Sequence, residues 1–502
     1  MRKRDWISKF SNSILRVTAF VVLSSMSACN DFLNEVPDNR VALTDLEKAA
    51  QLLTNAYSVS SFAFTDWMTD NTAFTKGVNI RQVHQRAYEW GEFVDDPNET
   101  DSPSFYWFQS YNAIAHANEV LAIIDNLPVT SEEDQRRKRA VESEARLTRA
   151  YAHFMLVNLF GKVYDSQTAN SDLGVPYVET PETVFIKTYK RNSVQSTYDK
   201  VEEDMLRGIE LVDDSFFANS GKYHFNRNAA LAFASRFYLW KGDLAKCIEY
   251  SNLLLGGDPG DFVRDLTSAE FQNASSSVFE YPQLYSSPNQ RSNLMLIRKI
   301  SLVQRTDFAH GPTNEVYDAV FDPNPFSATD TRENPSFVKG ENGLFPAWYE
   351  SLFERSSLNS NVGLPYHIAL FRGEEVLLNR AEARARNNDV NGAIADLQVL
   401  VNRRYQGTHT VTMSALRSFY GVAGNPFVSD RTVVTEYVLF ERRKEFITQG
   451  LRWFDIKRFK IPVTHVLGDD VTTIELAADD PRKVLQIPTS AIEVGGLKPN
   501  PR

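Results

Sequence analysis

Apolar residues recur every three or four positions in several stretches of the chain, which is the spacing of one face of an α-helix. The first stretch follows residues 44–47 (Thr-Asp-Leu-Glu), an order typical of a capping box at a helix start. Residues 145–160 are apolar on nearly every side, so we expect that helix at the centre, covered by neighbours. The pattern predicts helices near residues 46–57, 112–127, 132–160, 198–212, 229–240, 374–386 and 436–460.

A pattern of turn and apolar residues occurs twice in the chain. Residues 242–254 and residues 388–400 share a Gly-Asp or Asn-Asp turn followed by apolar residues at matching positions. Each copy follows a helix rich in Ala and Leu, and each has a small residue, Cys247 or Ala393, where two helices would meet. Such helix pairs are typical of tetratricopeptide units. We therefore predict a mainly α fold, an α-α superhelix of tetratricopeptide-like pairs that supports a loop-rich irregular lobe.

Residues 256–365 differ from the rest of the chain. Their many prolines oppose long helices, and Ser and Asn are frequent. Long stretches without regular structure are uncommon unless they serve a function. We expect this part to face the ligand. Because a single core stops growing at about 250–300 residues, the 502-residue chain predicts two lobes, or one lobe with a large insertion.

The predicted helix at residues 436–460 carries charges of both signs together with Trp453 and Phe454, which are too large to be left exposed. Mixed charges on a helix usually stabilise it through ion pairs. We expect this helix to be held by such pairs and to cap the core. The formal net charge of −10 argues against binding to nucleic acid, which needs a basic face.

The first 28 residues are typical of an export signal. Basic residues are followed by an apolar run at residues 14–26, too short to span a bilayer, and then by Ser27-Ala28-Cys29. A cysteine directly after small residues resembles the lipobox of bacterial lipoproteins, so we predict that Cys29 is lipidated; the alternative is an ordinary secretory signal. The only other cysteine is Cys247, which leaves no internal disulfide.

Several stretches, in this order, resemble the SusD/RagB family of surface lipoproteins. They are CNDFLNEVP (29–37), EARLTRAYAHFMLVNLFGKVY (144–164), AALAFASRFYLWKGDLAKCIEYSNLLL (229–255), RGEEVLLNRAEARARNNDVNGAIADLQVLVNRR (372–404), ERRKEFITQGLRWFDIKRF (441–459) and LQIPTSAIEVGGLKPNP (485–501). The resemblance implies a lipid-anchored outer-membrane protein that faces the cell exterior and captures an oligosaccharide. It also implies a partner, a SusC-like TonB-dependent outer-membrane transporter, over which the lipoprotein sits as a lid.

The resemblance and the patterns divide the chain into five parts. These are a signal peptide (1–28), a tether (29–40), an N-terminal helical region (41–255), a loop-rich ligand-facing lobe (256–365), and a C-terminal helical region with a tail (366–502). Peptide capture, as in RagB-type members, is the alternative within the family, and a surface glycoside hydrolase is the alternative outside it.

Sugar binding needs aromatic faces for the pyranose rings and polar groups for the hydroxyls. Trp67 and Trp348 are the first candidates, followed by Trp90, Tyr285 and Phe308. For each of them taken singly, the composition of ordinary cores favours a buried loop anchor over a ligand contact. The other aromatic residues outside the strongest helices are Trp107, Tyr349 and Tyr366, and nearby polar candidates are Asp66, Asn71, Asn289, Asn293 and Arg305.

Enzyme motifs are missing from the sequence. There is no H-E-x-x-H, G-x-S-x-G, Gly-rich phosphate loop or C-x-x-C, and the eight histidines show no i, i+4 pair. A carboxylate pair for glycoside hydrolysis stays open, because acids are plentiful and their separation is invisible in a sequence. We therefore expect a binding protein without a cofactor.

Overall fold

The longest helix is α6 (Glu132–Phe160), and nearly all of its residues from Ala140 onward are buried. The Ser131 side chain caps its first turn by accepting a hydrogen bond from the backbone N–H of Asp134. Three acidic residues at its start interact favourably with the helix dipole. The central position predicted for residues 145–160 is confirmed.

The protein is described here as a computed structural model. Residues Asp45–Arg502 form one compact unit in it, not two separate lobes. The residues that the structure describes are 43–184, 187–217, 220–277, 280–303, 308–333, 337–340, 343–346 and 365–502.

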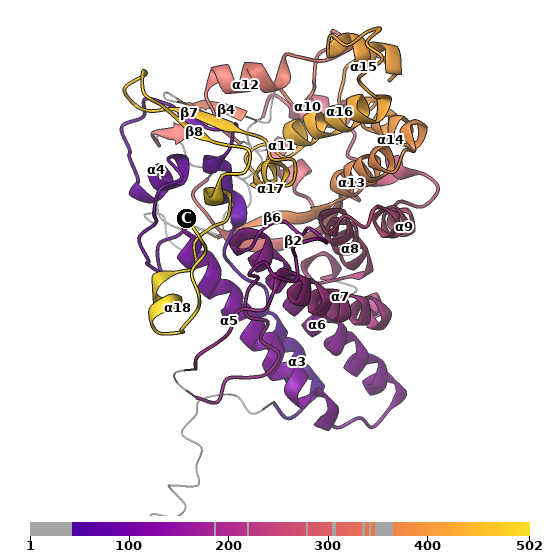
Figure 1. Ribbon diagram of the computed structural model, residues 1–502. Helices are drawn as coiled ribbons and strands as arrows, with labels where there is room; N and C mark the ends of the chain where they lie inside the picture. Colours follow the sequence, from indigo (N-terminus) through magenta and orange to yellow (C-terminus); the bar gives the residue numbers. More distant parts are fainter. Residues whose placement is uncertain are drawn as a thin grey trace, which may run out of the picture. The chain divides into compact units, whose positions relative to one another are not determined.

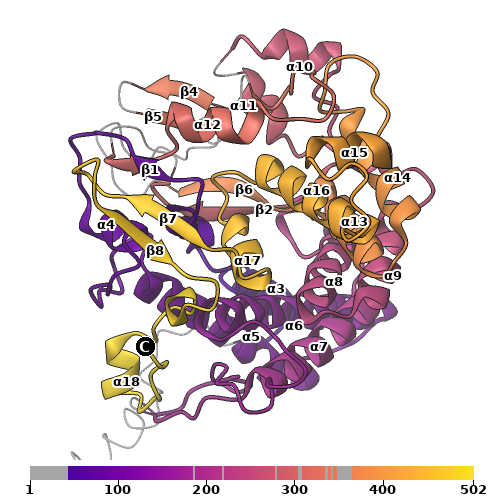
Figure 2. The same cartoon turned by 45° about the horizontal axis from the view of Figure 1, so that its top comes forward.

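Helices stacked against one another make up most of this unit, which confirms the mainly α prediction (Figures 1 and 2). Besides α6, the stack contains α3 (Leu46–Leu53), α5 (Pro103–Ile123), α7 (Val194–Leu211), α8 (Arg227–Lys241), α9 (Leu244–Leu255), α13 (Gly373–Arg386), α14 (Val390–Val401) and α16 (Asp430–Glu445). α6 packs against α3, α5 and α7, α8 packs against α7 and α9, and α13 packs against α9, α14 and α16. Consecutive packing of this kind is the arrangement of helical-repeat folds.

The predicted repeat corresponds to two helix pairs, α8–α9 and α13–α14. Gly242 and Asn388 both adopt the left-handed conformation at the turn, with φ of 84° and 64°. The Asp residue after each of them caps the second helix by accepting a backbone N–H. Cys247 and Ala393 are fully buried, and the Cys247 sulfur lies 3.7 Å from the Asn379 carbonyl oxygen. The small residues therefore allow close helix packing, as predicted.

Three helix predictions are wrong in detail. The predicted helix at residues 112–127 is α5, which begins at Pro103 behind the cap Ser102, so Trp107 lies inside a helix. The predicted capping box at the first helix began at residue 44, but the N-cap of α3 is Asp45, whose side chain accepts the Lys48 N–H. The predicted helix at residues 436–460 is two helices, α16 and α17 (Leu451–Arg458). The break is at Gly450, where φ is 79° and an added Cβ would lie 2.6 Å from a backbone oxygen of Phe62.

The described residues of the part predicted to be loop-rich form short helices and strands. They are η5 (Pro259–Phe262), α10 (Ala269–Ala274), α11 (Glu280–Tyr285), β2 (Asn293–Ile300), β3 (His310–Gly311), α12 (Asn314–Phe321), β4 (Phe337–Gly340) and β5 (Gly343–Pro346). β2 pairs antiparallel with β6 (Pro365–Arg372), β3 pairs with β1 (Ala73–Phe74), and β4 pairs with β5. The other elements are η1 (Phe62–Met68), α4 (Gln82–Tyr88), α15 (Met413–Phe419), β7 (Val463–Val466), β8 (Thr473–Leu476) and α18 (Thr489–Glu493).

Candidate functional site

A hollow of about 810 Å³ lies in the part of the chain predicted to face the ligand. η5, α10, α11 and the turn before β2 form it, together with Arg403, which follows α14. We call it the polar hollow, because its lining consists mainly of side chains that donate or accept hydrogen bonds: Asp261, Asp265, Glu270, Glu280, Gln283, Asn289, Arg291 and Arg403.

Charged groups of opposite sign face one another around the polar hollow. Arg291 Nη1 lies 2.9 Å from Asp261 Oδ2, and its guanidinium lies 5.2 Å from the centre of the Phe262 ring. Lys222 Nζ donates to the Gln290 carbonyl oxygen at 2.5 Å. Burial, together with the nearby guanidinium groups of Arg264 and Arg291, lowers the pKa of Lys222 to about 8. The charges around the polar hollow therefore lie in pairs of opposite sign and do not add up to a strong field of one sign.

Tyr285, a predicted ligand residue, lies beneath the polar hollow. Its side chain is buried, and the Arg264 guanidinium covers its ring at 3.8 Å from the ring centre. Arg264 Nη2 also donates to Asn293 Oδ1 at 2.6 Å, and Asn293 Nδ2 donates to the Tyr285 carbonyl oxygen at 2.9 Å. Tyr285 and Asn293 thus support the hollow from below, whereas Asn289 lines it.

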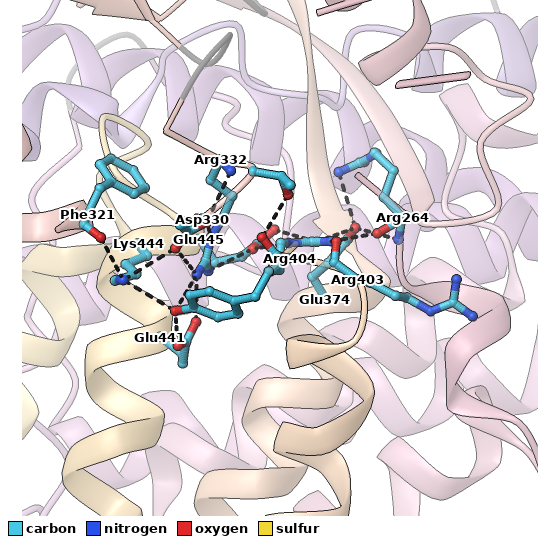
Figure 3. Close-up of polar contacts among 12 residues, drawn as sticks. Arg264, Phe321, Asp330, Arg332, Glu374, Arg403, Arg404, Glu441, Lys444 and Glu445 are labelled. Carbon is cyan, nitrogen blue, oxygen red and sulfur yellow. Dashed lines mark hydrogen bonds and ion pairs between the residues drawn. The ribbon is translucent and has the colours of Figure 1, made fainter. Parts of the chain in front are cut away.

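A buried network of charges joins the base of the polar hollow to α13 and α16 (Figure 3). At its centre, Arg404 forms two hydrogen bonds to Glu445, at 2.8 and 3.0 Å, and is fully buried. Arg332 lies 2.8 Å from Glu441 and 2.7 Å from Asp330. Burial alone would raise the pKa of Glu445, but the nearby guanidinium groups, that of Arg404 first, lower it to about 2.

The ion pairs predicted for residues 436–460 are confirmed. Arg442 Nε lies 3.0 Å from Asp455 Oδ2, and Arg458 Nη2 lies 2.7 Å from Asp455 Oδ1. Arg452 reaches out of the helix to Asp70 at 2.9 Å. Trp453 is fully buried. The charges therefore lie inside the protein and connect segments that are distant in the sequence.

Two of the predicted ligand aromatics, Trp67 and Phe308, contact the same histidine, and a third, Trp90, packs against another. His84 stacks on Trp67 with ring centres 3.6 Å apart and meets the edge of Phe308 at 4.6 Å. Trp90 stacks on His465 at 4.4 Å and donates its indole N–H to the Met68 carbonyl oxygen. Trp67 and Trp90 are only 3% and 5% exposed, and Phe308 is half-buried. Direct ligand contact by these residues stays a prediction.

The polar candidates next to Trp67 are also buried. Asp66 is 3% exposed, and burial raises its pKa to about 7. Asn71 accepts a hydrogen bond from Arg443 Nε at 2.8 Å. The bond between Asn71 and Arg443 thus connects the segment after η1 to α16.

A second hollow, of about 550 Å³, lies between α5, the segment 176–189 and the C-terminal residues 490–497. Its lining is mostly apolar and contains Trp107, Phe108, Tyr111 and Tyr189, so we call it the aromatic hollow. Trp107 packs edge-on against Phe160 of α6 with ring centres 4.9 Å apart. Helical periodicity predicted α5 only from residue 112 onward, so Trp107, Phe108 and Tyr111 lay outside the predicted helix, and nothing in the sequence placed the three segments together.

Some predicted residues lie outside the described ones. These are Cys29, Arg305, Trp348 and Tyr349, together with the side chain of Tyr366. In the described part of the chain, no group of three or more His, Cys, Asp or Glu side chains could hold a metal ion. No helix there is both long and apolar enough to cross a membrane.

The polar residues of the polar hollow, apart from Asn289, were not identified from the sequence. Glu270, Glu280 and Gln283 sit on helices of six residues, too short to give a periodic pattern. Arg403 reaches the hollow from more than a hundred residues further along the chain. The proline-rich composition of residues 256–365 was the available signal, and it identified the region but not its residues.

Two family models match the chain. Residues 31–239 match a SusD-like model described as starch-binding and associating with the outer membrane, and residues 353–486 match the model of the SusD family. A curated relative, SusD-like protein P2 of Formosa agariphila, is 23% identical over 270 residues, which cover 51% of this chain and 49% of the relative. The chain thus spans about half the length of that relative in the match.

Solved structures share the fold over almost the whole chain. A SusD superfamily protein from Bacteroides thetaiotaomicron is 20% identical and has a TM-score of 0.68, with 91% of this chain and all of that chain covered. A laminarin-binding SusD-like protein is 16% identical with a TM-score of 0.56, and 91% of this chain and 98% of that chain are covered. At these identities the likeness shows the fold alone.

Proposed function

Because the chain belongs to the SusD/RagB family, we propose that it is a lipid-anchored surface protein that binds an oligosaccharide and delivers it to a SusC-like TonB-dependent transporter. Proteins of this family are carbohydrate-binding and associate with the outer membrane. The observation that carries the proposal is the polar hollow, which has the size and the chemistry of a sugar site.

The polar hollow supports recognition of hydroxyl groups. Carboxylates and amide oxygens accept hydrogen bonds from sugar hydroxyls, and guanidinium and amide N–H groups donate to them. Glu280, Gln283 and Asn289 are exposed at the hollow and are free to turn toward a ligand. A volume of about 810 Å³ lies within the range of ligand sites and accommodates several sugar rings.

Phe262 packs against the core beside the polar hollow and supports the Arg291 side chain that lines it. It is half-buried and packs under the Arg291 guanidinium. A sugar ring seated beside this pair would accept a hydrogen bond from the Arg291 guanidinium and donate a hydroxyl hydrogen bond to Asp261. Binding and release would need no covalent step, and opening of the lid would couple ligand binding to uptake.

The anchor and the partner complete the proposed function. Cys29 follows a short apolar segment and two small residues, so lipidation there would hold the mature chain on the membrane. A protein anchored by lipid has no pore of its own, so uptake would require a transmembrane partner. The description of the matched family model as associating with the outer membrane supports this pairing.

Isothermal titration calorimetry with laminarin and soluble starch tests the binding site. We expect one of these glucans to bind the mature chain and Gln283→Trp, which fills the polar hollow, to weaken binding at least about tenfold. Gln51→Trp is the matched control, because Gln51 is equally exposed on α3, away from the hollow. Equal affinities of the two variants would place the sugar elsewhere.

The same samples distinguish the alternatives to sugar capture. Bound glucan recovered intact supports a binding protein, whereas new reducing ends would identify a hydrolase. A mixture of oligopeptides run in parallel tests the RagB-like alternative. Binding of peptides without binding of any glucan would replace the proposed ligand class.

Metabolic labelling with palmitate tests the anchor. Cys29→Ala should lose the label, whereas Cys247→Ala should keep it, because Cys247 is buried in the helix stack. Label in both variants would contradict lipidation at Cys29. Extraction in mild detergent should then co-purify a β-barrel protein of large mass, and repeated recovery of the chain alone would contradict the transporter pairing.

A further inference from the structure

The aromatic hollow is a formed cavity on a rigid base. The Tyr111 hydroxyl donates to the Pro176 carbonyl oxygen at 2.9 Å, and Asn118 Nδ2 donates to the Val178 carbonyl oxygen at 3.0 Å. These two bonds hold residues 176–178 against α5. At the opposite side, the Tyr189 N–H donates to the Gly495 carbonyl oxygen at 3.1 Å, which ties Tyr189 to the C-terminal residues. The cavity is therefore present before any ligand arrives.

The lining of the aromatic hollow favours flat apolar groups. Tyr111 and Tyr189 are half-buried, and Trp107 lies 4.9 Å from Tyr111 between ring centres. Val494, at 59% exposure, extends the apolar surface to the rim. Aromatic rings stack well on such surfaces.

Several polar groups of this hollow already have partners. The Tyr111 hydroxyl and the Asn118 amide bond to backbone carbonyls, and the Tyr189 hydroxyl donates to Glu182. A sugar ring placed here would find Asn112, Thr180 and Ser490 as polar partners and would otherwise face apolar side chains, so part of its hydroxyl hydration would be lost without replacement. The aromatic hollow thus disfavours the ligand that the polar hollow suits.

The cationic side chain of Lys187 lies at the rim of the aromatic hollow. Lys187 is exposed, and its ammonium lies 4.9 Å from the centre of the Tyr189 ring. An ammonium held over a ring still has N–H donors directed away from the ring for an anion. The single carboxylate of the lining, Glu182, already accepts the Tyr189 hydroxyl.

We propose that the aromatic hollow binds a flat aromatic ring that carries one anionic group, in the simplest case an aryl carboxylate. The ring stacks against Tyr111 and Tyr189, and the carboxylate pairs with Lys187. This site is separate from the polar hollow, since the two share no lining residue. The inference is also independent of the proposed sugar binding.

Saturation-transfer NMR and calorimetry with 3-phenylpropionate test the site on the mature chain. We expect binding with a dissociation constant below about 1 mM, and weaker binding of 3-cyclohexylpropionate, which has a similar volume but no aromatic face. Ala115→Trp, which fills the hollow from α5, should abolish binding. Ala122→Trp is the control, because Ala122 is exposed two turns further along α5 and does not line the hollow.

The charge is tested with Lys187→Gln. This variant should weaken 3-phenylpropionate about fivefold to tenfold and leave the uncharged 3-phenylpropanol unchanged. If Ala115→Trp does not fold, Val494→Trp fills the hollow from the exposed rim.

Absence of binding at about 10 mM, equal affinity in the filled variant, equal binding of the cyclohexyl compound, or no effect of Lys187→Gln would each overturn the proposal. Glucan titration of the same variants separates the two sites. Failure at the aromatic hollow leaves glucan binding at the polar hollow untouched, and the converse also holds.

Discussion

The polar hollow and the aromatic hollow are built in opposite ways. Short helices and turns surround the polar hollow, and its exposed polar side chains keep freedom to adjust. The aromatic hollow rests on α5, and hydrogen bonds to Pro176 and Val178 fix its shape. Hydroxyl groups need several donors and acceptors at variable positions, whereas a flat ring needs one rigid surface. The two hollows therefore suit different classes of ligand because the scaffold holds their lining residues with different firmness.

The largest effect should come from the charge network next to the polar hollow. Glu445→Leu removes the main partner of Arg404 and leaves buried guanidinium groups without a counter-charge. We expect the free energy of unfolding in urea to fall by about 3–5 kcal/mol, and glucan binding to be lost first. Glu436→Leu, at an exposed position of the same helix, should change stability by less than about 0.5 kcal/mol. Similar losses in both variants would contradict a role for the network.

The contribution of Glu445 to the free energy of unfolding should depend on pH. The folded pKa of Glu445 is about 2, below the ordinary value of 4.5, so its contribution is complete above pH 4.5 and is lost as the pH falls toward 2. The difference in unfolding free energy between the native chain and Glu445→Gln should shrink by about 3 kcal/mol between pH 7 and pH 2. A difference that stays constant across this range would show that the charge of Glu445 is not what stabilises the fold.

A smaller effect is expected at the edge of the polar hollow. Arg291→Ala removes an exposed guanidinium that pairs with Asp261, so the variant should stay folded but bind glucan about threefold to tenfold more weakly by calorimetry. Arg207→Ala is its control, because Arg207 forms a similar exposed pair with Glu210 on α7. Weaker binding in both variants would indicate a general charge effect.

The smallest effect is the response of the two hollows to salt. Raising NaCl from about 50 to 500 mM should weaken 3-phenylpropionate about twofold, because Lys187 is exposed and its attraction is screened. Glucan affinity should stay constant, since an uncharged ligand gains nothing from screening. An equal change of affinity with salt for both ligands, measured by calorimetry, would contradict the expected electrostatic difference between the hollows.

The sequence predicted what local patterns determine. The turns at Gly242 and Asn388, with their capping Asp residues, follow from a few neighbouring residues, so both helix pairs were found. The break at Gly450 was missed, because it depends on the close approach of Phe62, nearly 400 residues earlier.

The hollows could not be predicted for the same physical reason. Arg403 reaches the polar hollow from beyond α14, and Tyr189 meets the C-terminal residues through a hydrogen bond to Gly495. Trp67 was selected as a ligand aromatic because it lies in a non-helical stretch, yet stacking on His84 keeps it 3% exposed. Composition and periodicity do not encode contacts between such distant segments.

The buried thiol of Cys247 has a practical use. It sits at the packed contact between helix pairs, and burial raises its pKa to about 12, so maleimide reagents reach it only when the pairs separate. Its alkylation rate at neutral pH would therefore report how often the superhelix opens in the native state. An engineered surface cysteine could be coupled to a fluorophore without competition from this position.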